Sequence, residues 1–146
     1  MGLFDEIDYF DLAEDLDFVS WDNYHFHGAT PGIVALASDL MRGLKKNNVW
    51  VIEQQCGHIN WGPYNPAPKP GEVRLWTYQD IAHGTDGIVY FRWRAARIGA
   101  EQYHSGILKH DGSPSRVYDE IKQIGEELKK IEDILEGTTP EAEVAM

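Results

Sequence analysis

The stretch Val49-Trp50-Val51-Ile52-Glu53 decides the fold that we expect for this chain. Its first four residues form a short apolar run, as in a strand that is buried on both faces of a parallel sheet. Glu53 follows this run directly and precedes Gln54-Gln55-Cys56-Gly57. In α/β barrels the side chains at the C-terminal ends of the strands face a cavity, while the strands behind them are locked in the core. The position of Glu53 therefore predicts a functional carboxylate at the rim of such a sheet.

On both sides of this run, strand and helix patterns alternate. Apolar spacing predicts strands at residues 18–21, 49–52 and 87–91, and helices at residues 33–44, 75–82 and 117–135. This alternation is typical of parallel βα units, with function at the carboxyl ends of the strands. A barrel of this kind needs eight strands, so the expected fold class is α/β, a partial (β/α)8 TIM barrel of about three units. We expect residues 1–136 to form this domain and residues 137–146 to be a disordered tail.

Composition excludes several classes of protein. The 146 residues suit one globular domain, and no apolar stretch approaches the length of a membrane span. The N-terminus lacks the basic start of a signal peptide, so a cytoplasmic location is expected. The net charge of −11 is concentrated at the two ends of the chain, which argues against nucleic-acid binding. One cysteine and six histidines without metal-ligand spacing predict neither a metal site nor a cofactor.

The residue pattern leaves the role of Glu53 open. A carboxylate at the end of a strand can be a nucleophile or an acid/base in glycoside hydrolysis. It can also be a metal ligand, or a structural partner for an arginine such as Arg92 or Arg94. Glu101 and His104 are three residues apart, within reach of one small ligand, although such a pair can equally be structural. The residues alone therefore indicate a candidate site without fixing its chemistry.

Aromatic residues surround these groups in the sequence. Trp61 and Tyr64 lie in a loop stiffened by prolines, from residue 57 to residue 71. Long loops in compact domains are usually functional or disordered. Flat rings suit stacking on a sugar face, and packing of the loop on the sheet rim is the alternative reading. A sugar is the ligand that these residue types favour.

Several motifs in order resemble family 42 of the glycoside hydrolases, the bacterial β-galactosidases. The similarity spans roughly residues 8–130. It rests on Asp17-Phe18-Val19-Ser20-Trp21-Asp22-Asn23-Tyr24, on Asp39-Leu40-Met41-Arg42-Gly43-Leu44-Lys45, on Glu53-Gln54-Gln55 with Asn60-Trp61-Gly62-Pro63-Tyr64-Asn65-Pro66, and on Tyr90-Phe91-Arg92-Trp93-Arg94.

The resemblance assigns a role to each matched residue. It implies that Glu53 is the catalytic nucleophile and that Trp61 contacts the galactosyl unit. It implies that Glu101 and His104 bind hydroxyl groups of the sugar. Tyr24 and Trp21 would lie at the end of the sixth barrel strand, Glu53 at the seventh and residues 92–94 at the eighth, and we expect both rings to contact substrate.

Other parts of the family pattern are missing. The family's general acid/base is a glutamate that follows an asparagine, and this sequence contains no Asn-Glu pair. The sugar-binding arginine of the first half-barrel, the zinc-binding cysteine cluster of some members and the domains after the barrel are also absent. Cys56 stands where many relatives have a proline or a small residue. The resemblance is therefore to the second half of a barrel.

Two hypotheses follow. In the first, the chain is a fragment of a retaining β-galactosidase that acts on terminal β-D-galactosides and is inactive alone. Its partners would be a β-galactoside or oligosaccharide substrate and either the missing N-terminal half-barrel or a second copy. The second hypothesis is a non-catalytic carbohydrate-binding or assembly module that docks through open sheet edges. Both leave apolar sheet residues uncovered, and we expect Val19, Val51, Ile88 and Val89 or their neighbours to be exposed.

Overall fold

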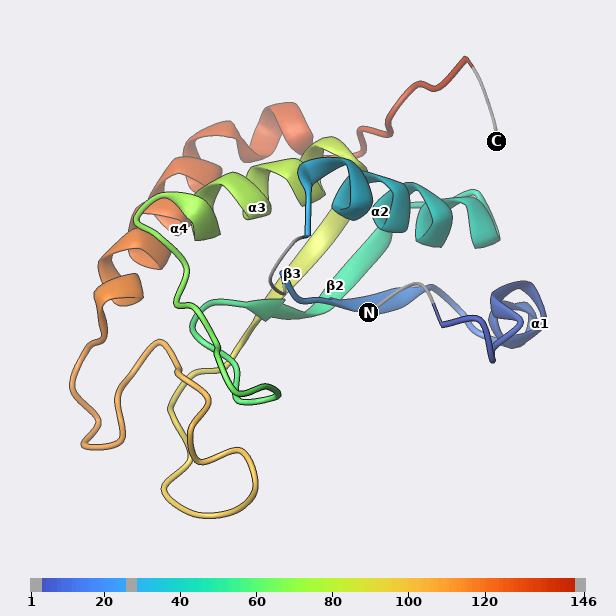
Figure 1. The fold of residues 1–146 in the computed structure, drawn as a ribbon. Coiled ribbons are helices and arrows are strands. Elements are labelled where there is room, and N and C mark those ends of the chain that lie inside the picture. The colour runs from blue at the N-terminus through green and yellow to red at the C-terminus, as the bar shows by residue number, and fades with distance from the viewer. Residues whose placement is uncertain (1–3, 26–28, 144–146) are drawn as a thin grey trace.

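The computed structural model describes residues 4–25 and 29–143. Its elements in chain order are α1 (Tyr9–Glu14), β1 (Ser20–Asn23), α2 (Pro31–Lys45), β2 (Val49–Gln55), α3 (Glu72–Ala82), β3 (Thr85–Phe91) and α4 (Arg116–Leu135). The strands form one parallel sheet in the order β1-β2-β3. Helices α2, α3 and α4 lie along one side of this sheet, and the long loops after β2 and β3 extend from its end (Figure 1). The predicted alternation of parallel βα units is confirmed.

Local sequence explains where the helices start and stop. Thr30 accepts the backbone N–H of Ile33 at the start of α2, and Pro31 occupies its first turn. Lys46 ends α2 in the left-handed conformation. The short helix α1 was not predicted. Its cap is Asp8, whose side chain accepts two backbone N–H groups, but six residues are too few to show a helical period.

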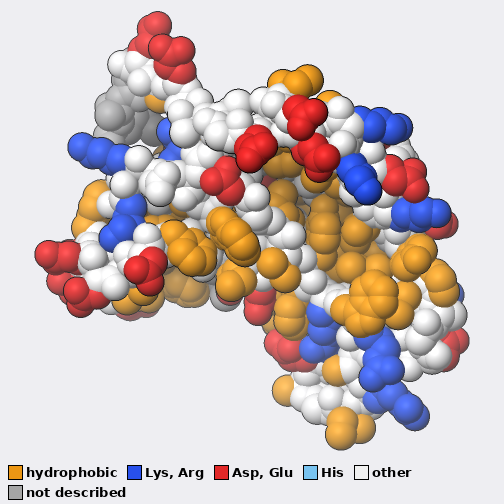
Figure 2. Space-filling model, turned by 180° about the vertical axis from the view of Figure 1, so that it is seen from behind, with side chains coloured by type: hydrophobic (Ala, Val, Ile, Leu, Met, Phe, Trp, Pro, Cys, Tyr) orange, Lys and Arg blue, Asp and Glu red, His pale blue; other side chains and the backbone are white. Residues whose placement is uncertain are grey.

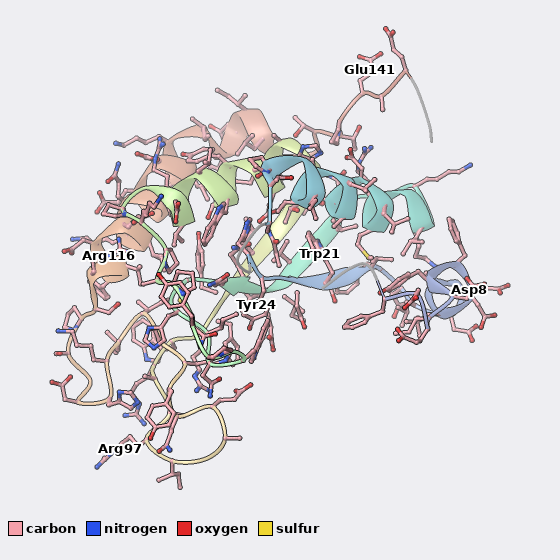
Figure 3. The ribbon with its side chains drawn as sticks, in the orientation of Figure 1. Asp8, Trp21, Tyr24, Arg97, Arg116 and Glu141 are labelled. Atoms are coloured by element: carbon pink, nitrogen blue, oxygen red, sulfur yellow. The ribbon has the colours of Figure 1, made fainter. Side chains whose placement is uncertain are left out.

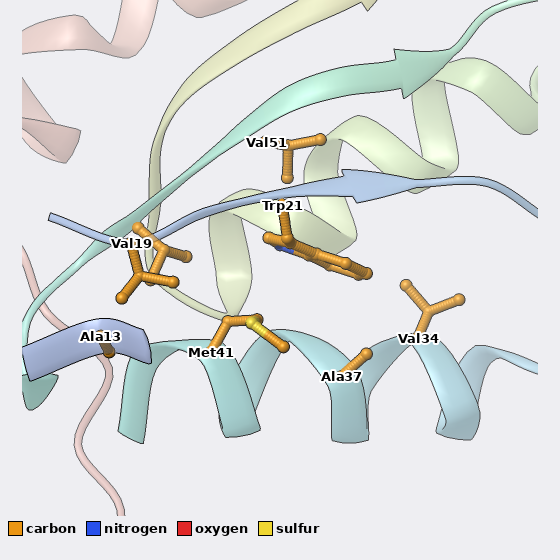
Figure 4. Close-up of a cluster of buried hydrophobic side chains, with 8 residues drawn as sticks. Ala13, Val19, Trp21, Val34, Ala37, Met41 and Val51 are labelled. Carbon is orange, nitrogen blue, oxygen red and sulfur yellow. The ribbon is translucent and has the colours of Figure 1, made fainter. Parts of the chain in front are cut away.

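The main core lies between the sheet and α2. Val19, Trp21 and Val51 point from the strands toward Met41 and its neighbours on the helix (Figure 4). A second cluster joins α3 and α4 to the start of the loops, with Cys56, Val73, Ile107, Val117 and Ile124 buried. These clusters fix one face of the sheet against the helices.

The opposite face of the sheet is open and apolar. Phe18, Trp50, Ile52 and Val89 are between 43 and 47 % exposed, and hydrophobic side chains gather over the middle of the molecule when it is seen from behind (Figure 2). The prediction of exposure was wrong for Val19 and Val51, which are buried. Side chains alternate between the two faces of a strand, and these two valines point to the helix side. We call Phe18, Trp50, Ile52 and Val89 the open face.

The last described residues follow α4 without regular structure. The carbonyl of Thr138 accepts a hydrogen bond from Asn48 at 2.8 Å, so this part of the chain lies against the body. The division into a domain and a tail stays a prediction. None of the helices in the described part of the chain combines the length and apolar character of a membrane span.

Candidate active site

The predicted site residues, except Trp21, lie at or beyond the carboxyl ends of the strands. Two loops meet there, residues 56–71 after β2 and residues 92–115 after β3. Tyr24 lies where the end of β1 faces these loops, and Arg97 lies at the far edge of the second loop (Figure 3). The parallel sheet thus gathers residues from three separate parts of the sequence at one end of the fold.

Tyr24 and Glu53 form the centre of the site. The Tyr24 hydroxyl donates a hydrogen bond of 2.8 Å to Glu53 Oε2. Burial raises the pKa of Tyr24, and the hydrogen bond to the Glu53 carboxylate raises it further. The tyrosine therefore stays a hydrogen-bond donor at neutral pH and orients one oxygen of the carboxylate.

An irregular register turns Glu53 toward this site. Strict alternation along β2 would place Glu53 on the helix side with Val49 and Val51. The pairing of β2 with β3 shifts register between Val51 and Gln54. Ile52 is exposed, while Gln54 is fully buried on the helix side, where it bonds Asn23, itself bonded to Asp80 on α3. Irregular pairing of this kind re-aims side chains near active sites. Glu53 can therefore reach Tyr24 on the side away from the helices.

Aromatic rings continue the site from Tyr24. The Trp61 ring lies 4.7 Å from that of Tyr24 and 5.8 Å from that of His104, measured between centroids. His104 also meets Phe91 edge to face, at 5.9 Å and 88°. Trp61 is 46 % exposed. These contacts place Trp61 where a ligand beside Glu53 could stack on it.

His104 is buried, with a relative exposure of 2 %. Burial lowers the pKa of its imidazole, which the nearby Glu101 partly offsets. The ring is therefore neutral at pH 7. Within the described ranges its Nε2 atom is buried and has no hydrogen-bond partner. Such a group costs free energy unless a partner is supplied.

Glu101 is held by an arginine from the end of β3. Arg92 Nη2 donates to the Glu101 backbone carbonyl at 2.6 Å, and Nη1 lies 3.4 Å from its carboxylate. The sequence left Glu53 as a possible partner of Arg92. In the structure Arg92 pairs with Glu101, and Tyr24 bonds Glu53. The sequence did show Arg92 directly after the predicted strand at residues 87–91, but not that Glu101 is its partner.

Trp21 lies apart from the other predicted site residues. It is 7 % exposed and packs against α2 in the main core (Figure 4). Trp21 and Tyr24 are three positions apart, so an extended chain cannot point both to the same face. We therefore do not include Trp21 among the residues proposed to contact a sugar.

Close contacts that the sequence reasoning missed join the two loops. The Ser105 hydroxyl and His58 Nδ1 are hydrogen-bonded, and Ser105 N donates to His58 O at 3.0 Å. Asn60 Nδ2 donates to Ala100 O at 2.8 Å. A Cβ atom on Gly57 would lie 2.2 Å from Ser105 Cβ, so only glycine allows this approach. These contacts fix Trp61 relative to His104.

Gly57→Ala should separate the loops. The added methyl group meets Ser105 Cβ rather than a flexible chain end, and overpacking of this kind costs about 1–3 kcal/mol. We expect a lower free energy of unfolding and loss of the ring contact between Trp61 and His104, measured by urea unfolding and by the His104 ring proton shifts. Gly62→Ala is the control, because its nearest neighbours lie 3.8 and 3.9 Å away. Equal behaviour of the two variants would contradict this role of Gly57.

Other chemistry finds less support in the described residues. Within them, no group of three or more His, Cys, Asp or Glu side chains is placed to hold a metal ion. Cys56 is buried, and its thiol donates to the Phe91 carbonyl at 3.1 Å. Burial raises the pKa of this thiol to about 12, so it is not a nucleophile at neutral pH.

The sequence matches the family model described as beta-galactosidase, of glycosyl hydrolase family 42, over residues 1–131. The chain belongs to glycoside hydrolase family 42. Among its relatives, beta-galactosidase BgaA of Thermus sp. is 42 % identical over 145 residues, which cover 88 % of this chain and 22 % of that protein. Beta-galactosidase BgaB of Geobacillus sp. is 42 % identical over 149 residues, with 100 % and 22 % covered.

Solved structures of the family share the fold. The beta-galactosidase from Bacillus circulans sp. alkalophilus superposes with a TM-score of 0.88 at 40 % identity, over 94 % of this chain and 21 % of that one. The three-stranded parallel sheet thus matches a portion of a family 42 barrel structure. The chain spans about a fifth of the length of these relatives.

Proposed function

We propose that this chain is the nucleophile-bearing part of a retaining β-galactosidase, with Glu53 as the nucleophile. The observation that supports this most directly is the hydrogen bond between Tyr24 and Glu53 at the carboxyl end of parallel strands, beside Trp61 and His104. The relatives are named beta-galactosidases, which supports β-galactosides as the substrate class. Terminal β-D-galactosides are the substrates that the proposal adds. By the family resemblance, the three strands would be the sixth, seventh and eighth of the barrel.

In this proposal Glu53 attacks the anomeric carbon and the leaving oxygen departs from the opposite face. The Tyr24 hydroxyl holds one Glu53 oxygen, leaving the other for attack. Trp61 provides an exposed ring for the sugar face, and the unpartnered Nε2 of His104 binds a hydroxyl. Glu101, held by Arg92, accepts from another hydroxyl.

In this proposal the general acid/base is not one of the carboxyl groups of this chain. A retaining enzyme needs an acid about 5–5.5 Å from the nucleophile, to protonate the leaving oxygen and later to activate water. Glu101 is the other predicted carboxylate of the site, and its ion pair with Arg92 favours binding over proton transfer. In the proposal the acid/base comes from another part of a family 42 barrel.

A covalent label tests the assignment of Glu53. A 2-deoxy-2-fluoro galactosyl inactivator should modify Glu53 in a complex of this chain with the rest of a family 42 barrel. Peptide mass spectrometry locates the label, and Glu53→Gln should abolish it. Glu101→Gln should slow the labelling by weakening sugar binding but leave its position unchanged. A label found on Glu101 would overturn the assignment.

The partner in that complex would be the missing half-barrel. In the described part of the chain β1 and β3 are the outer strands of the sheet, so each has one edge without a neighbouring strand there. The open face adds four partly exposed apolar side chains. A polypeptide with the first five βα units would pair both edges and cover this face.

Without that partner, the chain should self-associate. Exposed apolar surface and open strand edges favour pairing between copies. Size-exclusion chromatography with light scattering should show oligomers, and Trp50→Lys combined with Ile52→Lys should shift them toward the monomer. Leu36→Lys is the control, because this leucine is 44 % exposed on α2 rather than on the open face. A monodisperse, cooperatively melting wild-type monomer would contradict this expectation.

A non-catalytic sugar-binding module is the second candidate. The neutral His104, the exposed Trp61 ring and the paired Glu101 could bind galactose without an acid/base. Saturation-transfer NMR on the isolated chain tests this reading: galactose signals should be saturated by the wild type and far less by Trp61→Ala.

A further inference from the structure

Three buried polar side chains lie beneath the candidate site, on the helix side of the sheet. Asn23 Nδ2 donates to Gln54 Oε1 at 3.1 Å and lies 3.0 Å from both carboxylate oxygens of Asp80 on α3. None of the three residues is more than 1 % exposed. Buried polar groups are costly when they lose their partners, so these contacts constrain the strand ends strongly.

The cluster adjoins the site residues in the sequence. Asn23 precedes Tyr24, and Gln54 follows Glu53. The two strands pair irregularly at this point, since the register of β1 against β2 shifts between Trp21 and Asp22. Where the backbone ladder is irregular, the side-chain contacts of Asn23 and Gln54 help to fix the strand ends.

We propose that Asp80 is a positioning residue that, through Asn23 and Gln54, fixes the strand ends presenting Tyr24 and Glu53 to each other. Asp80 contacts neither of these two residues and acts from the opposite face of the sheet. This role in catalysis rests on the proposed function of Glu53, whereas the coupling itself does not.

The charge state of Asp80 should affect this coupling. Burial raises its pKa to about 7, which the hydrogen bond from Asn23 and the nearby His83 partly offset. Among the described residues, Tyr90 on β3 interacts electrostatically with Asp80, and His83 is hydrogen-bonded to Asp39 on α2. An ionised Asp80 accepts from Asn23 with both oxygens, while the neutral acid has one accepting and one donating oxygen. The position of Asn23 should change between these states.

NMR of the Tyr24 ring tests the proposal in the full 146-residue chain. Asp80→Ala removes two of the three acceptors of Asn23, so the Tyr24 ring carbon shifts should move toward those of Glu53→Gln. Asp80→Asn keeps an accepting oxygen and, being neutral, should restore the shifts that the wild type shows below pH 7. The wild type should also show a step in these shifts near pH 7 that Asp80→Asn lacks. In the complemented enzyme, Asp80→Ala should slow the labelling of Glu53 by on the order of tenfold to a hundredfold, as for small misplacements of reacting groups.

Thr77→Val is the matched control. Thr77 is fully buried on the same helix, but its hydroxyl bonds Tyr90 on β3 at 2.7 Å. Its loss should lower stability and leave the Tyr24 shifts unchanged. Unchanged Tyr24 shifts in folded Asp80→Ala would overturn the proposal, as would a pH step that is absent from the wild type or persists in Asp80→Asn. Failure to label wild-type Glu53 would reject the proposed function but not this coupling.

Discussion

Purified alone, the chain should show no measurable turnover of lactose. General acid–base help contributes about 10²–10⁴-fold to reactions of this kind, and the sequence has no Asn-Glu pair of the kind that the family resemblance assigns to the acid/base. Addition of a polypeptide with the first five βα units of a family 42 barrel should restore turnover, because it would bring that acid and cover the open sheet. Glucose release measured by a coupled assay checks both expectations.

An aryl galactoside with a very good leaving group makes the test sharper. The leaving group of such a substrate departs with little protonation, so the isolated chain could be glycosylated slowly at Glu53 without deglycosylation. A single slow burst of phenol release should therefore appear, and Glu53→Gln should remove it. Sustained lactose turnover by the single chain, abolished by Glu101→Gln, would show that Glu101 acts as an acid/base. The proposal that this chain carries the nucleophile without the acid/base would then be wrong.

The sequence predicted the order of the three strands and of α2, α3 and α4 because the apolar runs of strands and the helical spacing are strong local signals. It also led to Glu53, since an acid directly after an apolar run is visible in the sequence. The expectation that this run is buried on both faces was wrong, because Trp50 and Ile52 are 43 and 46 % exposed on the open face. The resemblance pointed to Trp61, Glu101 and His104, and the structure brings the two rings together near Tyr24. Their roles in binding stay proposals.

Side-chain direction was harder to predict. The alternation of side chains along a strand places Trp21 on the helix side, where it packs in the core. Only the family motif had assigned Trp21 to the site. The same alternation would place Glu53 on the helix side, yet a register shift in β2 makes it available to Tyr24. Such irregularities depend on how neighbouring strands pair, so no local pattern encodes them. The contacts of Gly57 with Ser105 and of Asp80 with Asn23 join residues 48 and 57 positions apart, which sequence spacing cannot reveal.

Asp80→Asn should remove a fall in stability between about pH 4 and pH 7. In the folded chain burial raises the pKa of Asp80 from 3.8 to about 7, so the folded state holds a proton that the unfolded state has already released. Stability is therefore full below the unfolded pKa and is lost as the pH rises through the folded pKa. At about 1.4 kcal/mol per pKa unit, the loss approaches about 4 kcal/mol.

Urea unfolding at pH 4, 5.5, 7 and 8 measures this difference. The amide in Asp80→Asn cannot ionise, so the variant should be the more stable protein above pH 7 and should show a flatter pH profile than the wild type. Asp111→Asn is the control, since this exposed carboxylate is held by Ser113 and its lowered pKa gives stability the opposite dependence on pH. The control should keep the fall between pH 4 and pH 7. If Asp80→Asn also lost stability between pH 4 and pH 7, the buried carboxyl group of Asp80 would not be the source of that loss. Ionisation of Asp80 beside Asn23 would then have no net free-energy cost for the folded state.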